Sequence, residues 1–251
     1  MNIEEYEKMF GVEDHHWWFV GKRRFVKVLL GRSVLPKDPQ ILDVGCGTGG
    51  MHLVLSKFGK VTGVDASEVA LGFARRRSLA ELRRAALPDL PFADSSFDVI
   101  TLFDVLYHRN VGDDATAIRE AARVLKPGGL VVITDSALRW LSGPHDVAMH
   151  GARRYSAQDL RRLLQGAGLS VERTTYLNFF LFPIAAAWRV LQRSFGGHPV
   201  GRSDVSEPSA LANALLGVLY RIEAWILSFV RLPWGTTVAA IGRKPGQQPL
   251  A

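Results

Sequence analysis

The amino-acid sequence predicts an α/β fold with a doubly wound, mostly parallel seven-stranded sheet and helices on both faces. Two observations predict it. Short apolar runs alternate with segments of helical periodicity along most of the 251 residues. The first run, residues 41–44, leads into the glycine-rich turn GCGTGG (residues 45–50) and then into a helical pattern. Because ligands of such sheets lie at the carboxyl ends of the strands, this turn marks the expected site.

The composition is that of an ordinary globular protein, with 47% hydrophobic and 22% charged residues. A net charge of +7 favours anionic ligands or surfaces. Cys46 is the single cysteine, so no disulfide forms within the chain. We find no secretory signal and no apolar run of about 20 residues. We therefore expect a cytoplasmic location and no membrane-spanning segment.

Residues 1–38 precede the first strand and are expected to form an N-terminal helical cap on the main domain, residues 39–251. The pattern indicates a helix, an aromatic turn DHHWWF (residues 14–19) and a second helix. Adjacent Trp17 and Trp18 have two interpretations. They either cover a site or anchor the cap to the core.

The central part of the chain shows the strand and helix alternation most clearly. The run KPGG (residues 126–129) reads as a turn. Strands are expected at residues 40–44, 61–65, 85–87 (weakly), 97–103 and 130–134, and helices from Met51, over 68–82 and over 116–124.

The last third of the chain adds further elements. After a long loop, residues 136–156, we expect a helix to residue 166, a strand over 169–176 and a final strand over 236–242. Between these strands lies a helical insertion, about residues 179–232. Its apolar helices, 179–195 and 210–230, are expected to form a lid, a homodimer face or a peripheral membrane contact, with packing on the sheet as the alternative.

The glycine turn fits two kinds of nucleotide ligand. Gly45, Gly47 and Gly50 satisfy G-x-G-x-x-G, and Asp65 follows about 20 residues later, as in dinucleotide-binding folds. A carboxylate there can bind the ribose of any adenosine ligand. Asp43, two residues before the first glycine, places a carboxylate where a cationic amino group is more welcome than a pyrophosphate.

Four stretches extend this pattern: ILDVGCGTGG, VTGVDAS, LPFADSSFDVITLFDVLYH and RVLKPGGLVVITDSA. Together they resemble the class I S-adenosylmethionine-dependent methyltransferases over roughly residues 40–137. The similarity is strongest to the small-molecule branch typified by ubiquinone and menaquinone methyltransferases. It implies a Rossmann-like fold and S-adenosylmethionine as cofactor. More weakly, HHWWFVGKRR, HDVAMHGARRYS and LPWGTTVAAIGRKP resemble a bacterial subgroup with largely unassigned substrates.

The resemblance also implies roles for individual residues. The cofactor-binding set is Arg23 (carboxylate), Asp43 (ammonium), Gly45, Gly47 and Gly49 (main-chain contact), Asp65 (ribose), Ala66 and Leu87 (adenine), and Phe103 and Asp104 (methionine side). Ala86 belongs to the set but departs from the family, which often has an acidic or polar residue there. Tyr107 likewise replaces a frequent glutamate, which affects the acceptor pocket.

The implied reaction is methyl transfer to a small, partly hydrophobic acceptor, without a metal. A general base is needed only if the acceptor carries its proton at neutral pH. The candidate bases are His108, His145, His150 and Tyr155. A nucleic-acid acceptor is disfavoured because neither the Asp/Asn-Pro-Pro-Tyr/Phe signature nor an RNA-binding module occurs. An NAD-dependent oxidoreductase and a non-catalytic binding protein are the alternatives.

Overall fold

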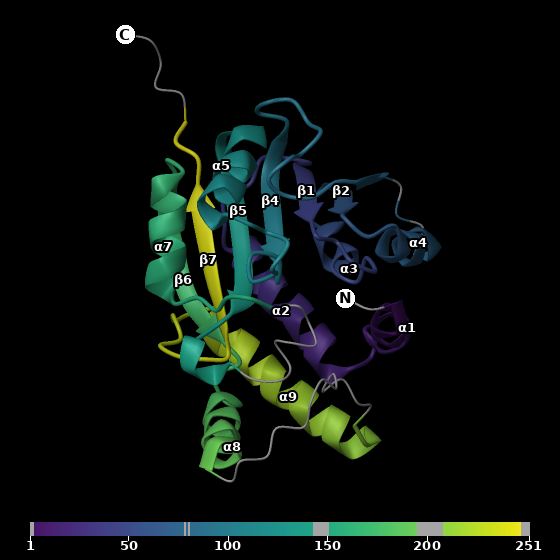
Figure 1. Cartoon of the computed structure of the whole chain (residues 1–251), viewed down its shortest axis with the longest axis vertical. Helices are drawn as coiled ribbons and strands as arrows, with labels where there is room; N and C mark the ends of the chain where they lie inside the picture. Colours follow the sequence, from purple (N-terminus) through teal and green to yellow (C-terminus); the bar gives the residue numbers. More distant parts are fainter. Residues whose placement is uncertain (1–2, 78, 80, 143–150, 195–207, 247–251) are drawn as a thin grey trace.

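The computed structural model describes residues 3–77, 79, 81–142, 151–194 and 208–246. Within them, seven strands form one sheet in the order β3-β2-β1-β4-β5-β7-β6, with helices on both faces (Figure 1). Only β7 runs antiparallel to its neighbours, β5 and β6. The predicted fold class is confirmed.

The strands at the centre of the sheet are buried on both faces, as parallel strands require. In β1 and β4 apolar side chains dominate, and Asp43 pairs in register with Thr101. The strands are β1 (Gln40–Val44), β2 (Lys60–Asp65), β3 (Glu81–Arg84), β4 (Phe97–Phe103), β5 (Leu125–Ser136), β6 (Ser170–Leu177) and β7 (Thr237–Arg243).

Most helices begin at a side chain that caps the unpaired amides of the first turn. The capping residues are His16, Ser67, Asp113, Ser156 and Ser209. The helices are α1 (Ile3–Val12), α2 (Trp17–Gly31), α3 (His52–Leu55), α4 (Glu68–Arg76), α5 (Asp114–Val124), the 3₁₀ turn η1 (Arg139–Leu141), α7 (Ala157–Gly166), α8 (Phe182–Ser194) and α9 (Ala210–Leu227).

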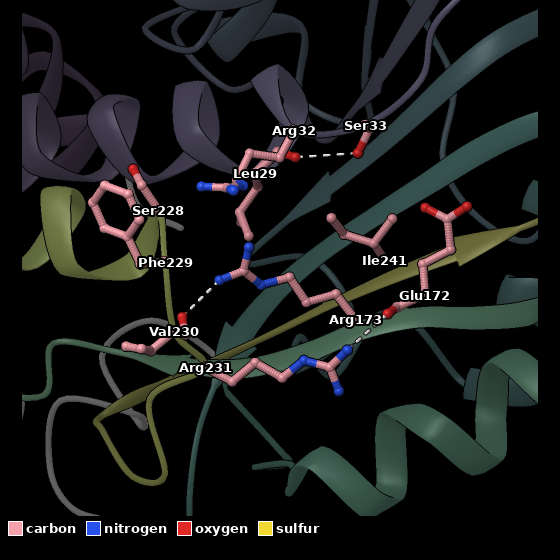
Figure 2. Close-up of a pocket in the computed structure, with 10 residues that line it drawn as sticks. All are labelled: Leu29, Arg32, Ser33, Glu172, Arg173, Ser228, Phe229, Val230, Arg231 and Ile241. Carbon is pink, nitrogen blue, oxygen red and sulfur yellow. Dashed lines mark hydrogen bonds between the residues drawn. The ribbon is translucent and has the colours of Figure 1, made fainter.

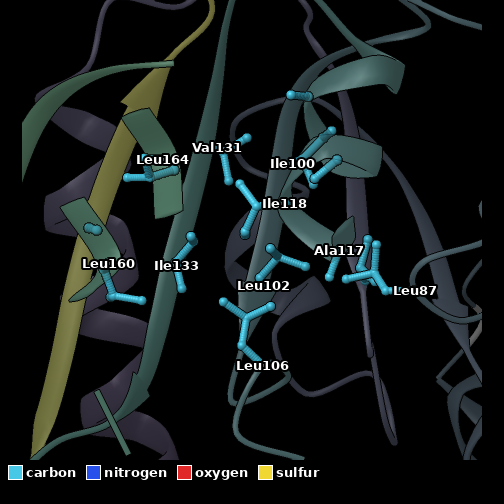
Figure 3. Packing of buried hydrophobic residues seen from close by; sticks show 14 of the residues in the cluster. Leu87, Ile100, Leu102, Leu106, Ala117, Ile118, Val131, Ile133, Leu160 and Leu164 are labelled. Carbon is cyan, nitrogen blue, oxygen red and sulfur yellow. The ribbon is translucent and has the colours of Figure 1, made fainter. Parts of the chain in front are cut away.

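Each face of the sheet has its own apolar core. On one face, side chains of β4 and β5 such as Leu102 and Ile133 pack against α5 and α7 through Ile118 and Leu160 (Figure 3). On the other face, α2 and α9 pack together over β1 and β7, with Phe25, Leu29, Tyr220 and Leu227 fully buried, among others. The cap and the helical insertion therefore share a core with the sheet.

Several predicted elements differ from the observed ones. The helix expected over 68–82 ends at Arg76, and the weak strand expected at 85–87 lies at Glu81–Arg84. This segment, ELRR, is an edge strand whose one partner in the sheet is β2. It contains a single apolar residue, so no apolar run in the sequence predicts it. The predicted turn at residues 126–129 lies within β5, at a register shift where Leu125 pairs with Phe97 and Leu130 pairs with Val99 of β4. Residues 17–19 of the expected aromatic turn begin α2 instead.

The contact between α2 and α9 depends on Gly21. A Cβ atom there would lie 1.9 Å from the Tyr220 ring, which is itself fully buried. We expect Gly21→Ala to lower the free energy of unfolding by about 1–3 kcal/mol, as overpacking does. Gly217→Ala in α9 is the matched control. Its Cβ would meet nothing within 4 Å, so it should leave stability unchanged or raise it. Urea denaturation measures both, and equal effects would contradict the prediction.

Among the described helices, α9 is long and apolar enough by length and composition to cross a membrane, with 18 residues and a mean hydropathy of 1.4. The sequence led us to expect no such segment. One side of α9 nevertheless belongs to the fold: Tyr220, Glu223, Ala224 and Leu227 are buried. The Glu223 carboxylate accepts hydrogen bonds from the amides of Phe179 and Phe180.

Candidate functional site

The glycine turn after β1 has a backbone that only glycine adopts without strain. Gly45, Gly47 and Gly49 have φ values of +72°, +55° and +85°. The amides of Gly45 and Cys46 donate to the Val64 carbonyl at 2.8 and 3.0 Å, which ties the turn to the end of β2. A Cβ at Gly45 would lie 2.6 Å from Val105 Cγ2. The turn therefore keeps main chain, not side chains, at the carboxyl end of β1.

A cavity of about 720 Å³ opens at this edge of the sheet. Its walls come from the cap, from the ends of β1, β2 and β4, and from α8. Nine of the predicted site residues line it: Gly45, Gly47, Asp65, Ala66, Ala86, Leu87, Phe103, Asp104 and His108. Segments far apart in sequence thus meet at the place the strand ends predicted.

Asp65 holds the glycine turn and faces the cavity. One carboxylate oxygen accepts from the Gly47 amide at 2.9 Å, and the other accepts from the Ser67 amide at 2.8 Å. Burial raises the pKa of Asp65, and these backbone hydrogen bonds oppose the rise. Each oxygen can accept a further hydrogen bond, so the carboxylate can receive two donors from a ligand in the cavity.

Asp104, at the end of β4, has an ion-pair partner from the cap. Lys22 of α2 pairs closely with its carboxylate, and both residues line the cavity. Asp104 has a φ of +56°, a strained value for a residue other than glycine. The pair places opposite charges side by side on the cavity wall.

Three residues of the predicted cofactor set do not line the cavity. The Arg23 guanidinium donates to the main-chain carbonyls of Glu13 and Asp14 at 2.8 and 3.3 Å. Gly49 faces Leu79 and α4. Asp43 is buried within the sheet, where its carboxylate accepts from the Thr101 hydroxyl at 2.6 Å. Their direct roles in ligand binding stay predictions.

The buried position of Asp43 in the sheet changes its acidity. Burial raises its pKa to about 7, the Thr101 hydrogen bond opposes the rise, and the nearby Asp65 adds to it.

The predicted bases are placed differently from one another. His108 lines the cavity, and its Nδ1 accepts from the Asn110 amide at 3.4 Å. Tyr155 is buried away from the cavity, where its hydroxyl contacts the Leu106 carbonyl at 3.0 Å and Asp114 at 2.9 Å. Burial and Asp114 raise the pKa of Tyr155. His145 and His150 lie outside the described residues.

Glu13 of the cap fastens the cap to the glycine turn. Its side chain is 5% exposed, and it accepts from the Thr48 hydroxyl at 2.6 Å and from Arg77 at 2.9 Å. Burial raises the pKa of Glu13, and Thr48 and Arg77 oppose the rise. Arg77 also pairs with Asp14, which is 54% exposed. We call Glu13, Thr48 and Arg77 the cap clasp.

Sequence reasoning missed several cap residues that line the cavity, among them Tyr6, Met9, Phe19 and Lys22. The adjacent tryptophans are the sequence feature that points to these cap residues. Trp18 lines the cavity, and Trp17 packs edge-on against Tyr220 with 5.1 Å between the ring centroids. The two interpretations of the pair thus each hold for one residue. The insertion also contributes Ala185 and Arg189 of α8.

Comparison with known proteins gives this site its class. Residues 42–133 match the family model of a methyltransferase domain. Over this stretch the chain is similar to that family, the class I S-adenosylmethionine-dependent methyltransferases. The methyl donor of the class is S-adenosylmethionine. The resemblance seen in the four sequence stretches is confirmed.

Individual proteins that are similar to this chain are also methyltransferases by name. A probable S-adenosylmethionine-dependent methyltransferase of Mycolicibacterium smegmatis is 30% identical over 65% of this chain and 63% of its own length. The demethylmenaquinone methyltransferase of Staphylococcus aureus is 38% identical over 50% of this chain and 52% of its own. A methyltransferase structure from Thermotoga maritima superposes with a TM-score of 0.61 at 22% identity, covering 96% of both chains, and shows the shared fold. The chain thus spans about half to two thirds of the curated relatives' length.

Proposed function

We propose that this protein transfers a methyl group from S-adenosylmethionine to a small, partly hydrophobic acceptor. The observation that carries the proposal is the joint position of the glycine turn and Asp65. A glycine main chain and a carboxylate with free acceptor capacity face one cavity, at the carboxyl ends of adjacent parallel strands. This donor and acceptor set suits an adenosine that carries an amino acid.

The residues present fit this cofactor. A Cβ at Gly47 would meet only the flexible end of Met9 at 3.7 Å, so the turn leaves room beside its backbone. Asp65 would hold the ribose hydroxyls, Ala66 and Leu87 would lie against the adenine, and Phe103 and Asp104 would face the methionine part. When bound, S-adenosylmethionine supplies a methyl group on a sulfonium centre, which needs no further activation.

The protein's own task is then to hold the acceptor in line and to exclude water, which contributes several kcal/mol through proximity. Tyr6, Trp18 and Leu141 give the cavity apolar surface, and its exposed lining is more apolar than polar. This supports an acceptor that is partly hydrophobic. Where the acceptor must lose a proton, His108 is the one predicted base that lines the cavity among the described residues.

The test is Asp65→Ala. Loss of the charged hydrogen bonds is expected to weaken S-adenosylmethionine binding by about 1–3 kcal/mol, a 5- to 150-fold rise in Kd by calorimetry. Glu68→Ala is the control, because Glu68 is exposed, pairs with Arg75 and does not line the cavity. Unchanged affinity in Asp65→Ala would refute the role of Asp65.

The same calorimetry separates the alternatives. Binding of NAD without binding of S-adenosylmethionine would support an oxidoreductase and end the methyltransferase proposal. Binding of S-adenosylmethionine without turnover across a broad acceptor panel would support a non-catalytic protein. We expect S-adenosylmethionine binding, and turnover with small acceptors but not with RNA or DNA.

A further inference from the structure

A second cavity lies at the C-terminal ends of α2 and α9. Its volume is about 280 Å³, and three arginines surround it: Arg32 at the end of α2, Arg173 in β6 and Arg231 after α9 (Figure 2). We call it the arginine cavity. Leu29 and Ile241 are its buried apolar wall.

The positive charge of the arginine cavity is uncompensated within the described part of the chain. Glu172 is the single acidic residue in its lining, and its carboxylate pairs with Arg243. Arg173 donates to the carbonyls of Leu227 and Val230 at 2.6 and 2.8 Å, while its buried Nε has no partner. Among the described residues, Arg231 donates to the Glu172 carbonyl at 3.3 Å. Three guanidinium groups with no carboxylate of their own suit a phosphate.

A stripe of large apolar side chains runs along α9 and ends at this cavity. Its members recur at intervals of four and three residues, so they share one face of the helix. Their exposed fractions lie between 42% and 71%. The apolar stripe consists of Leu211, Leu215, Val218, Ile222, Trp225 and Phe229, and Phe229 also lines the arginine cavity.

A second exposed apolar row lies on α8, at the same end of the molecule as α9 (Figure 1). Ile184, Trp188 and Leu191 are 68%, 62% and 50% exposed and are spaced by four and three residues. Trp234, after α9, is 46% exposed. Tryptophan favours the boundary between an apolar phase and water.

We propose that α8 and α9 lie on the surface of an anionic lipid membrane, with a lipid headgroup phosphate bound in the arginine cavity. Interfacial helices combine a large apolar face with basic residues, and each arginine near such a surface adds attraction to anionic lipid. The buried inner face of α9 keeps the helix in the fold, so it lies in the interface plane and does not span the bilayer. This proposal does not depend on methyl transfer.

A second copy of the chain is the competing occupant, because residues spaced by three and four also suit a coiled coil. A coiled coil through α9 would cover the apolar stripe alone. It would leave the row on α8 and the arginine cavity unexplained. The exposed charge of α9 is Arg221, since Glu223 is buried, so an anionic surface complements it better. One anionic membrane accounts for all three features.

The experiment is co-sedimentation of the full chain with vesicles of phosphatidylcholine, alone or mixed with phosphatidylglycerol. We expect binding to the mixed vesicles that weakens with added salt. The double variant Arg32→Gln/Arg231→Gln should weaken it about 25-fold, since one arginine is worth about five-fold. The control Arg75→Gln/Arg119→Gln removes the same charge from exposed arginines of α4 and α5 and should weaken binding far less.

The variant Leu215→Gln/Ile222→Gln should abolish binding to the mixed vesicles, while circular dichroism shows a preserved fold. Three results would overturn the proposal. The first is no binding to either vesicle, or equal binding to both that the arginine variant does not change. The second is a dimer in sedimentation velocity that the Leu215→Gln/Ile222→Gln variant dissociates. The third is calorimetric binding of inorganic phosphate to the arginine cavity without vesicle binding, which would make it a site for free anions.

Discussion

Glu13→Ala is expected to lower the free energy of unfolding by about 3–5 kcal/mol, the usual cost of removing one partner of a buried ion pair. The side chains of Glu13 and Arg77 are 5% and 10% exposed. The Nε atom of Arg77 already has no hydrogen-bond partner. Alanine would leave the guanidinium largely desolvated, with the exposed Asp14 as its remaining acid. Chemical denaturation with urea measures the change.

Asp14→Ala is the matched control, because Asp14 pairs with the same arginine from an exposed position. It should cost about 0–1 kcal/mol, as exposed ion pairs do. A Glu13→Ala effect no larger than the Asp14→Ala effect would show that the cap clasp does not anchor the cap. Because α1 contributes Tyr6 and Met9 to the cavity, the Glu13 variant should also bind the methyl donor more weakly.

Asp43→Asn is expected to make the fold more stable than the natural chain at alkaline pH, by up to about 4 kcal/mol. The pKa of Asp43 is about 7 in the folded chain, and that of an unfolded aspartate is about 4. Between these values the folded state holds a proton that the unfolded state lacks. The free energy of unfolding therefore falls as pH rises through this window, by ~1.4 kcal/mol per pH unit.

Asparagine is neutral at every pH and can still accept the Thr101 hydrogen bond. The two proteins should have similar stability near pH 4, and the gap should open up to about pH 7 and then stay constant. Urea denaturation across this range measures it. Asp89→Asn, which changes an exposed carboxylate, controls for the loss of one negative charge. A gap that does not change with pH would contradict the prediction.

The sequence predicted the central sheet well because its strands are buried on both faces, so each is an apolar run. The edge strand β3 was predicted less well. In β3, Glu81 and Arg83 face water, so the strand is not an apolar run. Its hydrogen-bonded pairing with β2, and not burial, makes this segment a strand. The turn expected at residues 126–129 fails for a similar reason. It lies within β5, where Leu125 and Leu130 pair with Phe97 and Val99 of β4 across a register shift, and no local pattern reveals these partners.

The candidate site likewise could be predicted only where a local sequence pattern specifies it. Its strand-end residues follow from a motif with fixed spacing, and most of them line the cavity. The cap residues depend on how α2 is rotated. Neighbouring positions on a helix point about 100° apart, so Lys22 faces the cavity while Arg23 faces the end of α1. The rotation is set by packing of α2 on Tyr220, which the sequence alone does not reveal.

The antiparallel β7 has a consequence for how this protein can vary. Leu177, the last residue of β6, pairs with Thr237, the first residue of β7. The whole insertion therefore leaves the sheet and returns to it at neighbouring points. An insertion with such closely spaced ends can change in length and sequence while the register of the sheet stays intact. Since α8 lines the cavity, exchanging this one module would change the cavity wall while the sheet keeps its register, provided that α9 keeps its contact with α2.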